Sequence, residues 1–143
     1  TDCAPLHTMS HALLKTFGNN IAFFRDPTRG GLATTLQEIA NSAQKGIRLQ
    51  ESAIPVREEV QAVCQVLGYD PLYLANEGKM IAIVRADVAD DVVQMMRTFT
   101  EGCDAVIIGD IANGNAGKVG LQTAVGGIRL LDMLGEDQVP RIC

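Results

Sequence analysis

Tryptophan is absent from this chain of 143 residues, and aromatic side chains make up only 4% of it. Any core must therefore be mainly aliphatic, and 47% apolar residues are enough to bury one without disulfides or a metal. Basic residues are in deficit, since the formal net charge is −5. Proteins that bind nucleic acids or anionic membranes need clustered positive charge, so we predict neither kind of partner. No apolar run reaches the roughly 20 residues that cross a bilayer.

Four cysteines and two histidines are scattered along the chain, with no Cys-x-x-Cys pair. Zinc sites draw on closely spaced ligands, and disulfide frameworks belong to short, loop-rich secreted chains. His7 and His11 share one face of a predicted helix, a geometry that can bind a metal, but no third ligand accompanies them. We therefore predict no metal site, and a reduced, cytoplasmic protein in which Cys3, Cys64 and Cys103 are incidental thiols.

The apolar patterns predict a single α/β (α+β) domain over residues 1–134, with a mixed β-sheet covered by helices. Residues 135–143 show no periodic apolar pattern and are predicted to form a mobile tail. The first residues lack the basic and apolar segments of a signal peptide. We expect the chain to be a piece of a longer protein.

Helices and strands are predicted from apolar spacing. The predicted helices cover residues 5–17, 32–43, 56–67 and 88–99, and the predicted strands cover 47–50, 79–85, 104–111 and 119–123, with short strands or extended segments at 21–25 and 128–131. The run at 79–85 is apolar on both faces, which is typical of a central strand. A turn at 114–117 is predicted to pair the strands on either side of it, and Asp87 is predicted to cap the last helix.

Two adjacent glycines, Gly30 and Gly31, stand directly before the second predicted helix. Their backbone N–H groups can point at an anion, and the helix dipole favours negative charge at this end. Arg29 adds a planar donor that suits phosphate or carboxylate, and Thr28 adds a hydroxyl. Asp26 could accept from the turn, cap the helix or help to hold a cation. The segment predicts an anion site, while spacing alone leaves a plain N-cap and turn as the alternative.

A second polar segment precedes the apolar run at 80–84. Asn76, Glu77 and Gly78 place a carboxamide, a carboxylate and a glycine at the edge of a predicted strand, where sites often lie. Glu77 is a candidate general base. The alternative is a surface turn in which Gly78 supplies a positive φ.

The chain ends on a cysteine, Cys143, which has no evident structural use at that position. An exposed free thiol is open to oxidation, so its presence favours a functional role. It would be a nucleophile on a mobile arm, able to visit one partner and then a second site. The adjacent α-carboxylate opposes thiolate formation, so activation needs a base or cationic surroundings. An incidental terminal cysteine is the alternative.

Three segments together resemble one family: Arg-Asp-Pro-Thr-Arg-Gly-Gly at 25–31, Ala-Asn-Glu-Gly-Lys at 75–79 and Pro-Arg-Ile-Cys at 140–143. They resemble the C-terminal half of the HypE family of hydrogenase maturation proteins, which make the cyanide ligands of nickel–iron hydrogenases. The first two segments are shared, in looser form, with aminoimidazole ribonucleotide synthetase and selenophosphate synthetase. The resemblance implies the fold of the C-terminal domain of the former synthetase.

The resemblance also implies a reaction. A carbamoyltransferase, HypF, places a carboxamide on the thiol of Cys143, and ATP phosphorylates the amide oxygen. Loss of phosphate and protons leaves a thiocyanate, and the cyano group passes to iron held by a HypC–HypD complex. Glu77 is then the base that removes the protons of the nitrogen. The residues implied to lie near the nucleotide are Asp26, Thr28, Arg29, Gly30, Gly31 and Asn76.

In the HypE family an N-terminal domain holds most of the ATP site, its Mg²⁺ ligands and the main homodimer contacts. That domain is absent from this sequence, so we expect the chain alone to be inactive and Glu77 not to be the sole base. Two other classes of function remain. One is a binding module that docks a partner or delivers a metal through Cys143, and the other is a superfamily relative that acts on a diffusible amide or selenide.

Overall fold

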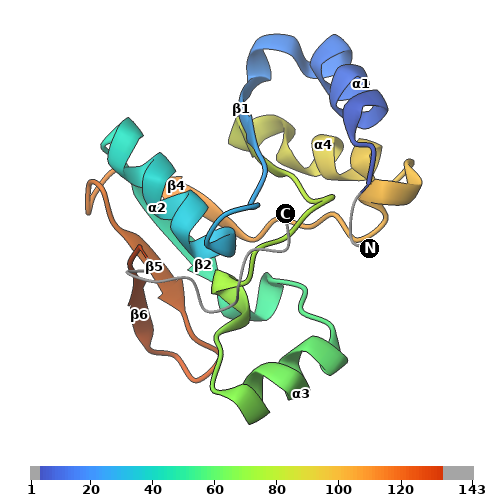
Figure 1. Cartoon of the computed structure of the whole chain (residues 1–143). Helices are drawn as coiled ribbons and strands as arrows, with labels where there is room; N and C mark the ends of the chain where they lie inside the picture. Colours follow the sequence, from blue (N-terminus) through green and yellow to red (C-terminus); the bar gives the residue numbers. More distant parts are fainter. Residues whose placement is uncertain (1–3, 134–143) are drawn as a thin grey trace. The chain divides into compact units, whose positions relative to one another are not determined.

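The computed structural model describes residues 4–133, which divide into two compact units (Figure 1). The units are made of discontinuous stretches: the described residues up to Pro27 with Asn76–Ile107, and Thr28–Ala75 with the described residues from Ile108 onward. The chain therefore passes from one unit to the other inside both polar segments, after Pro27 and after Ala75. The predicted tail at 135–143 lies outside the described residues.

The first unit contains α1 (His7–Phe17), β1 (Ile21–Arg25), β3 (Ile81–Val84) and α4 (Ala89–Met96), with β1 and β3 paired antiparallel. The core of this unit joins the two helices, because Met9 and Leu13 of α1 cluster with Val92 and Met96 of α4. Each of these four side chains is at most 8% exposed. The apolar stripes predicted for both helices are confirmed at these positions.

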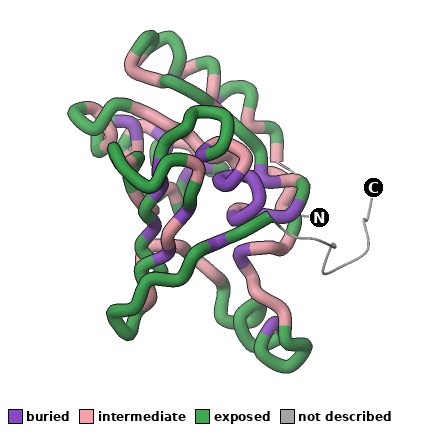
Figure 2. Tube along the Cα trace, turned by 90° about the vertical axis from the view of Figure 1, so that its left-hand side faces the viewer, coloured by how far each residue is buried: buried purple, intermediate pink, exposed green. Residues whose placement is uncertain are grey.

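The second unit contains α2 (Gly31–Ala43), β2 (Gly46–Gln50), α3 (Glu58–Leu67), β4 (Gly109–Ala112), β5 (Val119–Gln122) and β6 (Ile128–Leu131). Its strands form one mixed sheet in the order β4-β2-β5-β6, in which only β2 and β5 run parallel. Helix α2 contacts β2, β5 and β6. The strand side chains that are buried are Ile47, Leu49, Val119, Leu121 and Leu131. Along β5, the buried Val119 and Leu121 alternate with the less buried Gly120 and Gln122, as a half-buried strand requires, and Figure 2 colours the trace by burial.

The α/β class and the mixed sheet are confirmed, but two predicted pairings are wrong. The strand predicted to be central, β3, pairs only with β1 among the described strands, and its side chains are all half-buried. The strands on either side of the predicted turn at 114–117 do not pair, because β2 lies between β4 and β5. Inserting β2 gives its buried Ile47 and Leu49 a neighbouring strand on each side. A local pattern of apolar residues cannot report such an insertion.

Helix α3 forms as predicted, but its apolar face is not buried. Helical spacing places Val60, Val63 and Leu67 on one face of this helix, and these side chains are 38%, 57% and 56% exposed. The buried position of this helix is Cys64, at 2% exposure. The buried side chain is thus that of Cys64, next to the exposed Val63, because the side of α3 that carries Cys64 packs against other described residues.

The predicted cap of α4 is also wrong. Asp87 makes no cap hydrogen bond at the start of α4. Its carboxylate instead pairs with the guanidinium of Arg85 over 2.8 Å. A charged donor two residues away thus competes successfully with the backbone N–H groups. Among residues 4–133, no helix has the length and apolar character needed to cross a membrane.

Candidate functional site

The first polar segment connects β1 to α2. Gly30 is the N-cap of α2 with φ 61°, and Gly31 is its first residue with φ 64°. Both angles lie in the left-handed region, which glycine enters without the steric cost of a Cβ. The predicted helix at the glycine pair is confirmed, and it begins one residue earlier than predicted, at Gly31.

Close packing also explains the glycines. A Cβ at Gly31 would lie 2.5 Å from the carbonyl oxygens of both Leu72 and Leu74. A Cβ at Gly30 would lie 2.4 Å from Oγ1 of Thr34. Neither position can hold a larger residue without moving its neighbours. Since packing alone requires glycine at both positions, their predicted part in holding a phosphate stays a prediction.

The first polar segment contacts the second one at its start and packs, at its end, against the stretch that precedes the second one. Within the first unit, the backbone N–H of Asn76 donates to the carbonyl oxygen of Pro27 over 3.1 Å. Within the second unit, Gly31 packs against the carbonyls of Leu72 and Leu74, in the stretch that leads to the second segment. The structure thus brings together two segments that lie far apart in the sequence, as a shared role requires.

The carboxamide of Asn76 has a defined orientation. Its Oδ1 accepts a hydrogen bond from Nζ of Lys79 over 2.8 Å. An ammonium group can only donate, so the amide oxygen faces Lys79 and the amino group faces away from it. Lys79 belongs to the second segment but was not predicted as a site residue, because sequence alone does not show which side chain orients the amide.

The structure describes the predicted base, Glu77, and the turn at Gly78 that follows it. Glu77 is half-buried and has interactions of its own within the described residues. Gly78 has φ 62°, which confirms the positive φ predicted for it. The turn conformation explains the glycine, and the role of Glu77 as a base stays a prediction.

Arg29 differs from its neighbours in having no interaction partner among the described residues. Its side chain is exposed, and within residues 4–133 it makes no hydrogen bond or ion pair. Thr28 is half-buried and Asp26 exposed, and both have interaction partners. Arg29 is therefore the residue of this segment with a full set of guanidinium donors to offer an anionic ligand.

The terminal thiol of Cys143 lies outside the described residues, as does Cys3. Cys64 is a buried free thiol and Cys103 an exposed one. Within the part of the chain that the structure describes, no group of three His, Cys, Asp or Glu side chains is placed to hold a metal ion.

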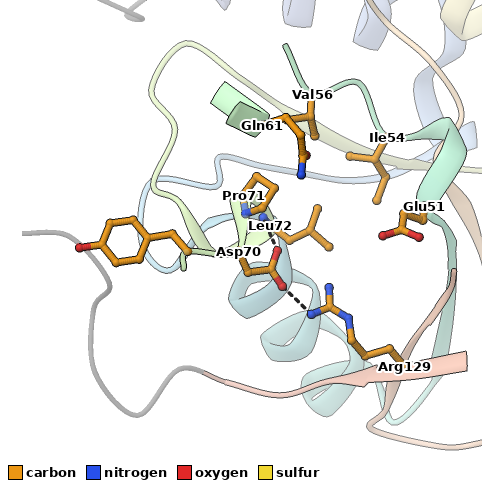
Figure 3. Close-up of a pocket in the computed structure, with 9 residues that line it drawn as sticks. Glu51, Ile54, Val56, Gln61, Asp70, Pro71, Leu72 and Arg129 are labelled. Carbon is orange, nitrogen blue, oxygen red and sulfur yellow. Dashed lines mark hydrogen bonds and ion pairs between the residues drawn. The ribbon is translucent and has the colours of Figure 1, made fainter. Parts of the chain in front are cut away.

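A separate pocket of about 430 Å³ lies within the second unit (Figure 3). Its wall carries an ion pair of 2.6 Å between Arg129 of β6 and Asp70, whose other carboxylate oxygen accepts from the backbone N–H of Leu72 over 2.9 Å. The remaining lining residues are Glu51, Ile54, Val56, Gln61, Tyr69 and Pro71. None of the predicted site residues is among them, so this pocket is distinct from the two polar segments.

The fold and the paired polar segments define a class of protein. Residues 1–122 match the family model described as "AIR synthase related protein, C-terminal domain", and the chain belongs to this family. The chain is also homologous over its whole length to HypE proteins. It is 45% identical over 143 residues to "Carbamoyl dehydratase HypE" of Bradyrhizobium diazoefficiens and 36% identical to that of Escherichia coli K12, and in each case 100% of this chain matches 41% of the relative.

Solved structures agree with these matches. A crystal structure of HypE in complex with ATP matches 100% of this chain and 44% of that one, with a TM-score of 0.93 and 44% identity. A HypE–HypF complex matches 94% of this chain and 43% of that one, with a TM-score of 0.88 and 38% identity. The chain thus spans less than half the length of these relatives.

Proposed function

We propose that this chain is the C-terminal part of an ATP-dependent carbamoyl dehydratase that carries its substrate on Cys143. The observation that carries the proposal is the 45% identity, over the whole chain, to a carbamoyl dehydratase HypE. The complete enzyme would supply cyanide ligands for the active site of nickel–iron hydrogenases. The chain alone is expected to be inactive, because most of its relatives' length is missing from it.

The terminal thiol is chemically suited to the reaction. A thiolate attacks the carbonyl carbon of an activated carbamoyl donor, and the S–C bond forms as the bond from that carbon to the donor's leaving group breaks, which gives a thiocarbamate on Cys143. Expelling oxide from an amide carbon is difficult, so ATP first transfers its γ-phosphoryl group to the amide oxygen. The C–O bond then breaks, phosphate leaves with that oxygen, and the nitrogen loses both protons. The products are a thiocyanate on Cys143, ADP and phosphate, and the thiol becomes the leaving group when the cyano group is passed on.

The described residues offer the polar groups that these steps need. Arg29 has a guanidinium without a partner in the part of the chain that the structure describes, and it lies next to the N-terminus of α2, where negative charge is favoured. Asp26, Thr28, Gly30 and Gly31 belong to the same segment, and we assign this segment to the phosphates of the nucleotide. Asn76, oriented by Lys79, is assigned to the same ligand.

Glu77 is assigned as the base that takes protons from the nitrogen. It follows Asn76 directly, and the backbone of Asn76 is tied to Pro27 in the nucleotide segment. Removing two protons from one nitrogen requires either two bases or two encounters with one base. The N-terminal domain would supply the additional group.

ATP and Mg²⁺ are the cofactors of the proposed reaction. The donors of Arg29 and of the first turn of α2 fit the phosphates of ATP, and a related HypE has been solved in complex with ATP. No carboxylate cluster among the described residues suits Mg²⁺. The family resemblance assigns the Mg²⁺ ligands mainly to an N-terminal domain, and we assign phosphate donors to this chain.

Two partners follow from the chemistry. A donor must place the carbamoyl group on Cys143, and a related HypE forms a solved complex with HypF. An acceptor must then take the cyano group, and we assign this role to iron held by a HypC–HypD complex. A homodimer and a cytoplasmic location belong to the same proposal.

Mass spectrometry of the C-terminal peptide tests the proposal. The full-length protein is incubated with the carbamoyltransferase, carbamoyl phosphate and ATP, and Cys143 should gain a carbamoyl group and then lose water from it. Cys143→Ser is the matched control, because it keeps the size of the side chain and removes the thiol. An unmodified Cys143 in the wild-type protein would overturn the proposal.

Two further measurements, metal binding and the activity of a truncated protein, separate the two rival functions. A binding module that delivers a metal through Cys143 predicts tight, thiolate-dependent metal binding without any gain of carbamoyl mass. A superfamily relative that acts on a diffusible amide or selenide predicts full activity after residues 140–143 are removed.

A further inference from the structure

A buried hydroxyl near the start of α2 has no hydrogen-bond partner. Thr34 is 8% exposed, and its Oγ1 is buried without a partner among the described residues. Buried hydroxyl groups are normally paired, because an unmade hydrogen bond leaves the cost of desolvation uncompensated. An exception of this kind calls for an explanation, such as a ligand that completes the bond.

The neighbouring threonine shows what a purely structural hydroxyl does in this helix. Oγ1 of Thr35 is also buried, and it donates to the carbonyl oxygen of Gly31 over 2.9 Å. This bond to the carbonyl four residues back is the usual solution for threonine inside a helix. Thr34 does not make the corresponding bond, although its backbone N–H does reach Gly30 O over 3.3 Å.

The unpaired hydroxyl lies at the N-terminal end of α2. Side chains on a helix lean back toward its N-terminus. In this case Oγ1 of Thr34 is so close to Gly30 that a Cβ there would lie 2.4 Å from it. Only the lack of a side chain at Gly30 leaves room beside the hydroxyl.

We infer that Thr34 is a further binding residue for the phosphates of ATP, whose oxygens accept a hydrogen bond from its hydroxyl. The inference rests on the proposed function and adds a donor that the sequence did not indicate. The first-turn N–H groups of α2 and the unpaired guanidinium of Arg29 flank the same helix end. Because solvent does not reach Oγ1 in the ligand-free protein, binding includes a small shift of the Gly30–Gly31 peptide, which glycine permits.

Two conservative variants of the full-length protein test the inference. Thr34→Val removes the unpaired hydroxyl and keeps the shape of the side chain, so the thermal midpoint without ligand should stay equal or rise. The dissociation constant for ATP, measured by calorimetry, should increase roughly tenfold, as expected for a lost hydrogen bond to a charged group. Thr34→Ser keeps the hydroxyl and should bind ATP like the wild type.

Thr35→Val is the matched control and should behave in the opposite way. It removes a hydroxyl that is already paired, so the thermal midpoint should fall while ATP affinity stays unchanged. A fall in the midpoint of Thr34→Val would overturn the inference, because its hydroxyl would then have a structural partner. Unchanged ATP affinity in Thr34→Val would also overturn it.

A further variant separates this inference from the proposed function. If Arg29→Met weakens ATP binding and Thr34→Val does not, the inference about Thr34 fails and the nucleotide segment stands. If the wild-type protein does not bind ATP, or Arg29→Met binds it equally well, the assignment of the segment to the nucleotide fails, and that of Thr34 fails with it.

Discussion

The backbone N–H of Asn76 donates to the carbonyl oxygen of Pro27 over 3.1 Å. This bond joins two polar segments that the sequence separates, and it lies where the chain passes between its two compact units. One segment comes directly after β1, and the other comes before β3. These two strands pair antiparallel, and their register places Arg25 opposite Ile81. The end of β1 and the start of β3 therefore meet, which brings the two segments together.

Gly31→Ala should destabilise the protein strongly. The left-handed backbone costs a non-glycine residue about 1 kcal/mol or more, and the new Cβ would also strike the carbonyls of Leu72 and Leu74. We expect a total loss of about 3 kcal/mol in the free energy of unfolding, measured by urea denaturation. Gly68→Ala is the control, because Gly68 has φ 71° but nothing within 4 Å of its Cβ position. Equal losses in the two variants would contradict the role of packing at Gly31.

The ion pair between Arg85 and Asp87 should make the free energy of unfolding depend on pH in the acidic range. The pKa of Asp87 lies below its ordinary value, chiefly because Arg85 donates hydrogen bonds to its carboxylate. A lowered pKa in the folded state means that the stabilisation is present at neutral pH and is lost as the pH falls through that pKa. Both side chains are exposed, so the effect is small.

Urea denaturation of the wild type and of Asp87→Asn at several pH values measures this effect. The wild type should be the more stable at pH 7, and the difference should vanish in acid because protonation removes the same charge. Arg85→Gln should behave like Asp87→Asn, since it removes the same two hydrogen bonds. A difference that stays constant with pH would assign the effect to something other than the carboxylate charge.

Serine substitutions in α3 should distinguish its buried position from an exposed apolar position. Cys64→Ser places a hydroxyl at a site that is 2% exposed and should cost about 1–3 kcal/mol. Val66→Ser changes a side chain that is 86% exposed and should alter stability by no more than about 0.5 kcal/mol. Chemical denaturation of both variants is the measurement. A comparable loss in Val66→Ser would show that the side chain of Val66 is covered in solution.

Glu77→Gln should stop the full-length enzyme between its two chemical steps. The amide keeps the size of the side chain but cannot take up a proton from the nitrogen. Mass spectrometry should then show the carbamoyl group accumulating on Cys143 at the wild-type rate, with little conversion to thiocyanate. Cys143→Ser, in contrast, should not accept the carbamoyl group. Normal thiocyanate formation by Glu77→Gln would remove Glu77 from the role of base.

The local sequence predicted most helices and strands correctly, but it did not predict which strands pair with each other. The stripes of α1 and α4 and the start of α2 after Gly30 were predictable, because helical periodicity and glycine punctuation are properties of adjacent residues. The separate pairing of β1 with β3 and the insertion of β2 between β4 and β5 were not. Both depend on partners distant in the chain, and a local run of apolar residues does not specify which strand it pairs with.

The predicted site divides in the same way. The residue types and their spacing sufficed to single out Asp26, Arg29, Asn76 and Glu77, because glycines and charged groups at element ends are visible in any sequence. Which partners they have was not visible. Lys79 orients the amide of Asn76, and Thr34 has a hydroxyl without a partner, although both looked ordinary.

The sequence by itself determined the chemistry that this chain can offer: a terminal thiol, a carboxylate, a carboxamide and a guanidinium beside paired glycines. It also determined the class of fold, because amphipathic helices and short apolar strands need one another to bury their apolar faces. Only the tertiary structure decided that the two polar segments meet, that Arg29 stays unpaired within residues 4–133 and that Gly31 admits no side chain. These facts depend on distances between residues remote in the chain, and such distances are set by strand pairing and packing rather than by local preference.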